Sequence, residues 1–237
     1  MRKPLLSLIL AAVPLMALAE ADQTAADLPG TGAEDPHQAR GRVADLALAH
    51  ALFALGKAQG DALTLIAAAN MAAEAAAAPG PELKRETSGP VAAEPAGELP
   101  EAPLDAGDIF ARAEALAGDD PLLLELIEAA KAASAESREP HTGPGAAFFR
   151  EAELQPGRTD TWEIPRAAGE YAEISVLASG SQALNFALRD EEGQLICSES
   201  APADQIYCGF LPAGAGVFYL SVENTGTTLS RYVLLTN

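Results

Sequence analysis

The side chains best suited to chemistry in this 237-residue chain include three histidines, and their spacing predicts no metal site. His37 and His141 fall in polar segments that contain proline, and His50 falls in a helical pattern. None of them has a second ligand four residues away, as a helical zinc motif requires. We therefore expect neither a metal nor another cofactor.

Nucleophiles and paired carboxylates also give no recognisable catalytic constellation. No serine lies in a Gly-x-Ser-x-Gly elbow, and residues 146–237 contain no histidine from which a Ser-His-Asp triad could be built. Asp190, Glu191 and Glu192 precede Gly193, which is typical of a solvated turn. A glycosidase needs two carboxylates on opposite sides of a cleft, and sequence alone does not place them. The sequence predicts no catalytic residue and a protein that is not an enzyme.

Cys197 and Cys208 are the two cysteines of the chain. An even cysteine count in an exported protein favours a disulfide, and each residue ends or lies in an apolar run. A redox-active pair is the alternative, but the Cys-x-x-Cys spacing that it would need is missing. We predict a structural disulfide that closes a short loop.

Two tyrosines are candidates for a ligand-binding surface. Tyr171 and Tyr219 lie off the apolar phase of their strand-like runs, so their side chains are expected on the surface. Trp162 shares the apolar phase of its run and is more typical of a core position.

The elements that would position these residues form an all-β domain over residues 146–237. Runs of apolar and β-branched residues alternate there and are separated by Gly- or Pro-containing turns, as in a sandwich or barrel. We predict an antiparallel, jelly-roll-like β-sandwich of about eight strands. The predicted strands cover residues 148–154, 161–165, 171–178, 184–190, 195–198, 206–210, 217–223 and 231–236.

The same residues resemble bacterial pre-peptidase C-terminal domains. The runs DTWEIP (160–165), LNFALRDEEG (184–193), GVFYLSVEN (216–224) and SRYVL (230–234) are similar to four strand motifs of that family. The resemblance implies a jelly-roll-like accessory module of the kind appended to secreted enzymes. Residues 181–184 (SQAL) lack the Asp-x-Asp that the family often has there, so the resemblance does not carry over a calcium site.

The N-terminus has the pattern of a secretory signal peptide over residues 1–19. Arg2 and Lys3 precede an apolar run that ends in the A-x-A site Ala17-Leu-Ala19. An uncleaved membrane anchor is the alternative, but the apolar run is short for a span. We expect cleavage after Ala19, a periplasmic or secreted location, no membrane span in the mature chain, and a flexible leader over residues 20–34.

Residues 35–138 form a helical region in which a Pro-rich linker, 79–106, separates two hairpins. The first hairpin is expected to begin at Asp35-Pro36, with a first helix that runs to about Leu55 and ends at Gly56 and Gly60. Asp61 can cap its second helix, which runs to Ala78 and has Leu63, Ile66, Ala67 and Asn70 on one inward face. The second begins near Asp105, and Asp120 starts its second helix. The two hairpins can pack as a four-helix bundle. A joint, 139–145, leads to the sandwich, which gives an α+β protein with segregated domains.

The chain has a formal net charge of −19, which disfavours nucleic acid because binding to phosphate relies on Lys and Arg. We expect an exported, non-enzymatic binding or accessory module that acts on a protein or polysaccharide in the periplasm or at the cell surface. One alternative is an accessory or diverged subunit of a secreted hydrolase acting on peptide or glycan. Another is a structural envelope protein without a discrete ligand.

Overall fold

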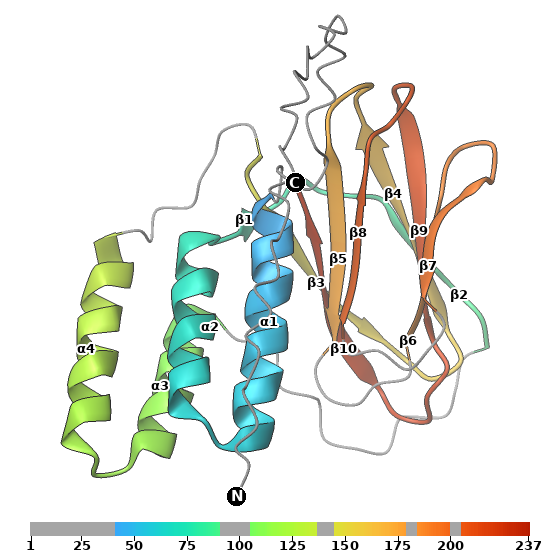
Figure 1. Ribbon diagram of the computed structural model, residues 1–237. Coiled ribbons are helices and arrows are strands. Elements are labelled where there is room, and N and C mark those ends of the chain that lie inside the picture. Colours follow the sequence, from blue (N-terminus) through green and yellow to red (C-terminus); the bar gives the residue numbers. More distant parts are fainter. Residues whose placement is uncertain (1–40, 91–104, 137–144, 179–183, 200–204) are drawn as a thin grey trace, which may run out of the picture. The chain divides into compact units, whose positions relative to one another are not determined.

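The computed structural model describes residues 41–90, 105–136, 145–178, 184–199 and 205–237 (Figure 1). The predicted signal peptide, the flexible leader and all but Gly145 of the predicted joint lie outside these residues. The described residues form four helices in the N-terminal half of the chain and a β-sandwich of two five-stranded sheets, most of whose strands lie in the C-terminal half, which confirms the α+β class with segregated helical and β parts.

Both predicted helical hairpins are present, and three aspartates start their helices as expected. The side chains of Asp61, Asp105 and Asp120 accept backbone N–H bonds of 2.9–3.0 Å from the first turns. These bonds satisfy N–H groups that have no partner inside the helix. The helices are α1 (Arg42–Gln59), α2 (Ala62–Glu74), α3 (Ala106–Ala117) and α4 (Pro121–Glu136).

The bounds of α1 differ from the predicted ones. Asp35-Pro36 lies outside the described residues, within which the helix begins at Arg42 with Gly41 as its N-cap. It continues through Gly56 to Gln59, four residues beyond the expected end. Gly56 is buried, and a Cβ atom there would lie 2.8 Å from Leu65 Cδ2 of α2. Close packing between the two helices thus accounts for this glycine inside a helix.

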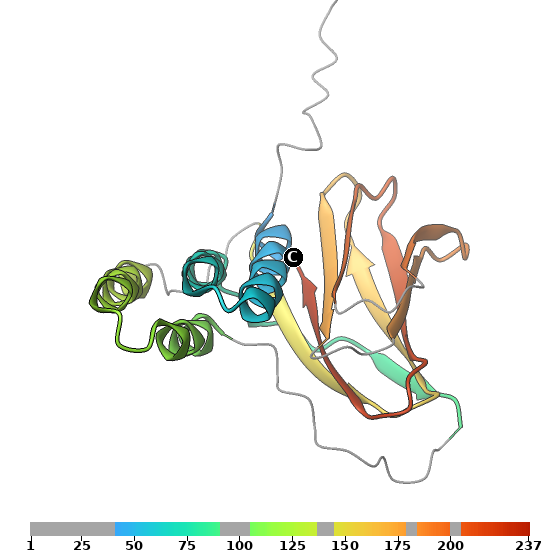
Figure 2. The ribbon, with the colours of Figure 1, turned by 60° about the horizontal axis from the view of Figure 1, so that its bottom comes forward.

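Side chains from all four helices form one core rich in alanine, and α2 contacts each of the other three helices (Figure 2). Small side chains allow the helix backbones to approach closely. The predicted inward positions of Leu63 and Ala67 are wrong, because Leu63 is 53% exposed and Ala67 is also exposed, while Ile66 is buried. The fully or nearly buried residues include Leu65, Ala68, Ala69, Ile109, Phe110, Ala113 and Ile127.

The β-sandwich has the strand order of a jelly roll, as predicted. One sheet has the order β1-β3-β10-β5-β8 and the other β2-β4-β9-β6-β7, and consecutive strands from β3 to β6 alternate between them. The eight predicted strands are all present. Their bounds are β3 (Phe148–Leu154), β4 (Thr159–Arg166), β5 (Ala172–Ala178), β6 (Leu184–Arg189), β7 (Leu195–Glu199), β8 (Gln205–Phe210), β9 (Gly216–Asn224) and β10 (Ser230–Thr236).

Two further strands lie where the sequence predicted linker. β1 (Ala78–Pro79) pairs with β3, and β2 (Arg85–Ser88) pairs with β4, so each adds an edge to one sheet. Because β1 takes up Ala78, α2 ends at Glu74 rather than at Ala78. The range 79–106 is therefore not linker throughout, although its residues 91–104 lie outside the described part. β2 consists of polar residues, so it has no apolar alternation by which it could be recognised.

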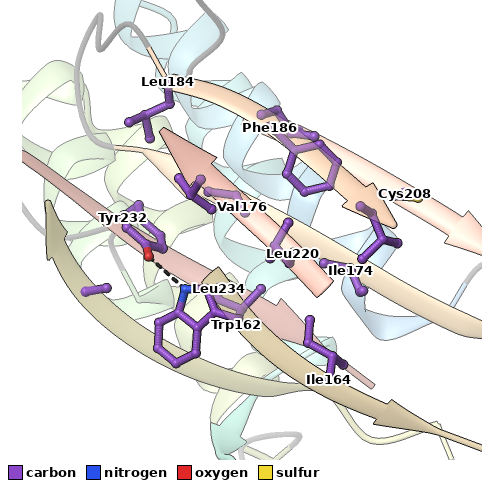
Figure 3. Packing of buried hydrophobic residues seen from close by; sticks show 14 of the residues in the cluster. Trp162, Ile164, Ile174, Val176, Leu184, Phe186, Cys208, Leu220, Tyr232 and Leu234 are labelled. Carbon is purple, nitrogen blue, oxygen red and sulfur yellow. Dashed lines mark hydrogen bonds between the residues drawn. The ribbon is translucent and has the colours of Figure 1, made fainter. Parts of the chain in front are cut away.

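A polar network is buried inside the apolar core of the sandwich, and Figure 3 shows the part of it that joins Trp162 to Tyr232. Trp162 Nε1 donates to the hydroxyl of Tyr232 at 2.8 Å, and that hydroxyl donates to Asp160 Oδ2 at 2.6 Å. Asp160, which is fully buried, also accepts from Thr87 at 2.6 Å and pairs with Arg85 at 2.7 Å. Edge strand β2 is thus attached to β4 by side chains as well as by backbone.

Helix α1 covers the outer face of the sheet that contains β5. Val43 packs in one buried cluster with Leu177, Val233 and Leu235, which point away from the sandwich core. This contact explains why every residue of β5 is buried, whereas a strand with one solvated face would alternate.

Candidate binding groove

A groove of about 460 Å³ lies at one end of the sandwich. Its walls are the turn 190–194 between β6 and β7 and the connection 211–215 between β8 and β9. The neighbouring ends of β7, β8 and β9 form its floor. Loops held by a rigid sandwich are common positions for binding sites.

The floor and one wall of the groove are apolar. The rings of Phe210 and Phe218 lie 4.9 Å apart and are tilted by 54°, and Ile196 and Val217 flank them. Leu211 extends the apolar surface into the wall and is 64% exposed. An exposed leucine beside a half-buried aromatic pair leaves apolar surface that a ligand could cover.

The opposite wall carries three consecutive carboxylates. Asp190 Oδ1 accepts the backbone N–H of Gln194 at 2.7 Å, which fixes the turn. Glu191 Oε1 accepts the backbone N–H of Val217 at 2.8 Å, which attaches the turn to β9. Gly193 has φ +80°, a conformation that favours glycine. Glu192, which lies between Glu191 and Gly193, is exposed. The turn therefore holds negative charge at a fixed place beside the apolar floor.

The predicted disulfide between Cys197 and Cys208 is present, and it lies next to this groove. Cys197 is in β7 and Cys208 is in β8, the edge strands of opposite sheets, with Cα atoms 6.3 Å apart. Ile196 and Phe210, which line the groove, are one and two residues from the two cysteines. The bridge thus fixes the separation of two strands from which the groove is built.

The two tyrosines predicted for a ligand surface lie on different sheets. Tyr171 precedes β5, and its hydroxyl lies over Gly209, where a Cβ atom would come within 2.1 Å of it. Tyr219 is half-buried in β9, directly opposite Glu163 and Arg189 in the neighbouring strands. They do not form one platform together, and neither lines the groove.

Tyr171 instead belongs to a hydrogen-bonded group at the start of α1. Its hydroxyl interacts with that of Tyr207, which donates to Glu173 Oε1 at 2.7 Å. The same oxygen accepts the backbone N–H of Gly41, the N-cap of α1, at 3.1 Å. A carboxylate of β5 thus caps a helix from another part of the chain.

Burial raises the pKa of Glu173, although the hydrogen bonds from Tyr207 and from the backbone N–H groups of Gly41 and Ala44 partly oppose this effect. Because the pKa is higher in the folded state than in the unfolded state, the folded chain binds more protons between the two values. Its free energy of unfolding should therefore fall as pH rises through this window.

Glu173→Gln should remove that dependence, because the amide carries no charge and its oxygen can still accept the bonds from Tyr207 and Gly41. Relative to wild type, the variant should gain stability as pH rises from about 4 to 7. Urea unfolding at a series of pH values measures this difference, with Glu170→Gln at an exposed site as the control. A constant difference between Glu173→Gln and wild type across this range would contradict the assignment.

The histidines contribute to no site within the described residues. His37 and His141 lie outside them, and His50 is half-buried on α1. In the described ranges no three His, Cys, Asp or Glu side chains are grouped closely enough to hold a metal ion.

Comparison with known proteins gives matches among solved structures and none elsewhere. No family model and no curated protein matches the chain. The C-terminal part is similar to the pre-peptidase C-terminal domain of collagenase from Bacillus anthracis, with 22% identity over 38% of this chain and 88% of that one (TM-score 0.34). That domain bears the name of the family whose strand motifs the sequence resembles.

Two other matches are to proteins of different description. One is PliG of Aeromonas hydrophila, a periplasmic inhibitor of g-type lysozyme, with 14% identity over 38% of this chain and 84% of that one (TM-score 0.31). The other is the C-terminal CBM6 of LamC, a marine laminarinase from Zobellia galactanivorans, with 10% identity over 38% of this chain and 91% of that one (TM-score 0.23).

The groove could not be identified from the sequence. Asp190, Glu191 and Glu192 have the pattern of a solvated turn, and nothing in the sequence places that turn against residues 210–218. One signal was available, because Leu211-Pro212 continues an apolar strand into a loop. Exposed apolar residues in a loop can mark a contact surface.

Proposed function

We propose that the chain is an exported, non-enzymatic binding protein that recognises a protein or a polysaccharide through the groove beside turn 190–194. The observation that carries this proposal is the groove itself, which combines an apolar floor with a few fixed polar groups, as binding sites usually do. We place its action in the periplasm or at the cell surface.

The disulfide supports export, because such bridges persist mainly in oxidising compartments. The A-x-A pattern at Ala17–Ala19 is the second reason, and it leads us to propose cleavage after Ala19. As for the helices, none in the described ranges is both long and apolar enough to cross a bilayer.

The arrangement of carboxylates supports binding over hydrolysis. The three acidic residues at the groove lie on one turn, and two of them accept backbone N–H bonds that hold the turn and β9 in place. General acid–base hydrolysis of a glycan needs carboxylates on both sides of the bond that is cleaved. The other groove-lining residues carry no carboxylate that could face them.

Blocking the groove tests the proposal. Ala213 is exposed on the groove wall, so Ala213→Arg should fill the groove without disturbing the fold. The immobilised mature chain is incubated with the envelope fraction of the source organism and, separately, with soluble polysaccharides. We expect wild type to retain a binder and Ala213→Arg to bind it at least about tenfold more weakly. This factor corresponds to about 1.4 kcal/mol of binding free energy.

Ala67→Arg provides the matched control, because Ala67 is an exposed alanine of α2 and does not line the groove. This variant should retain the binder as wild type does. Equal retention by all three proteins would show that the groove is not the binding site.

A further inference from the structure

We propose that the groove binds a peptide segment that carries a lysine or arginine next to a bulky apolar residue. This inference rests on the proposed function, since it names the class of ligand for the same groove. It follows from the shape of the apolar floor, the position of the carboxylates and the charge of the chain.

The floor suits an apolar side chain better than a sugar ring. Sugars stack on aromatic rings whose faces are open to solvent, whereas Phe218 is buried and Phe210 is half-buried against it at a tilt of 54°. The exposed apolar surface comes instead from Leu211, with Ile196 and Val217 nearby. An aliphatic or aromatic side chain placed there would remove this surface from water.

The carboxylate wall suits a cation beside that side chain. Glu192 is exposed, and Asp190 and Glu191 are held beside it by their bonds to Gln194 and Val217. No lysine, arginine or histidine is among the residues that line the groove. Arg189 precedes the turn and donates from Nη1 to the backbone oxygen of Gly193 at 3.0 Å, so one cation lies beside three carboxylates and the turn keeps a net negative charge. A ligand cation would therefore be attracted to this wall, in a chain whose net charge is −19.

The groove is formed before any ligand binds, which favours recognition of a short segment. Two backbone bonds of 3.1 Å close the acidic turn in addition to the side-chain bond, because the N–H of Asp190 donates to Gln194 O and the N–H of Gly193 donates to Asp190 O. The disulfide fixes β7 and β8 at the opposite side. A ligand therefore does not have to order these walls, a cost that otherwise lowers affinity.

Selection from a random peptide library displayed on phage tests the inference. The mature protein is the bait, and peptides that also bind Ala213→Arg are removed. We expect the remaining peptides to be enriched in Lys or Arg adjacent to Leu, Ile, Phe or Trp. Binding of the most enriched peptide should weaken as salt is added, because the charges lie at an exposed rim.

A charge reversal at the groove sharpens the test. Glu192→Gln should weaken the enriched peptide about two- to fivefold and Glu192→Lys about five- to tenfold at low salt, the range of exposed ion pairs. Repeating the selection on Glu192→Lys should shift the preference towards acidic peptides. Glu125→Lys, at an exposed site on α4, makes the same change in net charge and should leave binding unchanged.

The possible outcomes separate this inference from the proposed function. Peptides that depend on the groove but show no enrichment of basic residues would overturn the inference and leave the groove as a binding site. A neutral polysaccharide that binds wild type but not Ala213→Arg, together with a selection that yields no peptide, would also overturn the inference and leave the groove as a binding site. If nothing binds in a way that Ala213→Arg abolishes, both proposals fail.

Discussion

Replacing Asp160 with alanine is expected to lower the free energy of unfolding by about 3–5 kcal/mol, the cost of breaking a buried ion pair. The substitution removes the carboxylate that accepts from the hydroxyls of Tyr232 and Thr87 and pairs with the guanidinium of Arg85. Burial and the nearby carboxylate raise the pKa of Tyr232, so its hydroxyl remains a proton donor that needs an acceptor. Urea or thermal unfolding of the variant measures the loss.

The chain contains a matched control on the same strand. Glu163 of β4 also pairs with a cation next to β2, Lys84 at 2.5 Å, but this pair is solvent-accessible. Glu163→Ala should therefore cost less than about 1 kcal/mol. Comparable losses for Asp160→Ala and Glu163→Ala would show that the buried network does not stabilise the sandwich beyond an ordinary surface pair.

Reducing the Cys197–Cys208 disulfide is expected to lower the free energy of unfolding by about 2–3 kcal/mol. The bridge closes a short loop, with 11 residues of sequence separation, and restricts the unfolded chain. At about 2–4 °C per kcal/mol for a chain of this size, Tm should fall by about 4–12 °C. Melting curves with and without reductant measure this shift.

The double variant Cys197→Ser/Cys208→Ser is the control for reductant. Its melting curve should lie close to that of the reduced wild type and should not respond to added thiol. If oxidised and reduced wild type melt together, the bridge does not contribute to stability. The peptide selected for the groove should also bind the double variant more weakly, because the bridge lies between two groove strands.

The sandwich was predictable because its strands alternate. Trp162 and Ile164 in β4, and Leu184, Phe186 and Leu188 in β6, are buried at every second position, as expected for strands with one face in a core. The aspartates at helix starts were predictable for a similar reason, because a cap acts within three residues of its own position.

The features of the fold that could not be predicted from the sequence depend on contacts between residues that are distant in the chain. Asp160 is in phase with Trp162 and Ile164, so its burial could be inferred, but its partners Arg85 and Thr87 lie more than 70 residues away. The strand β2 that carries them is polar and short. The α2 helix is so rich in alanine that its periodicity does not show which side is buried, and Leu63 was misplaced for this reason.

The groove was not predictable because it joins two turns that are separate in sequence. Residues 190–194 and 211–215 meet only because β6, β7, β8 and β9 bring their ends together in the jelly roll. Neither turn contains a binding motif by itself. The disulfide was predictable from cysteine count and compartment, but its link between the two sheets was not.

The strand order has a consequence for the sequence of events in folding. β10, the last element of the chain, occupies the middle of its sheet between β3 and β5, and β3 pairs with it across about 80 residues. During synthesis the helices can form early, whereas this sheet cannot close until residues 230–236 have emerged. Pairing over such separations slows folding, so this sheet remains incomplete until residues 230–236 are available to pair. A chain that folds late in this way is suited to transport across a membrane before its tertiary structure forms.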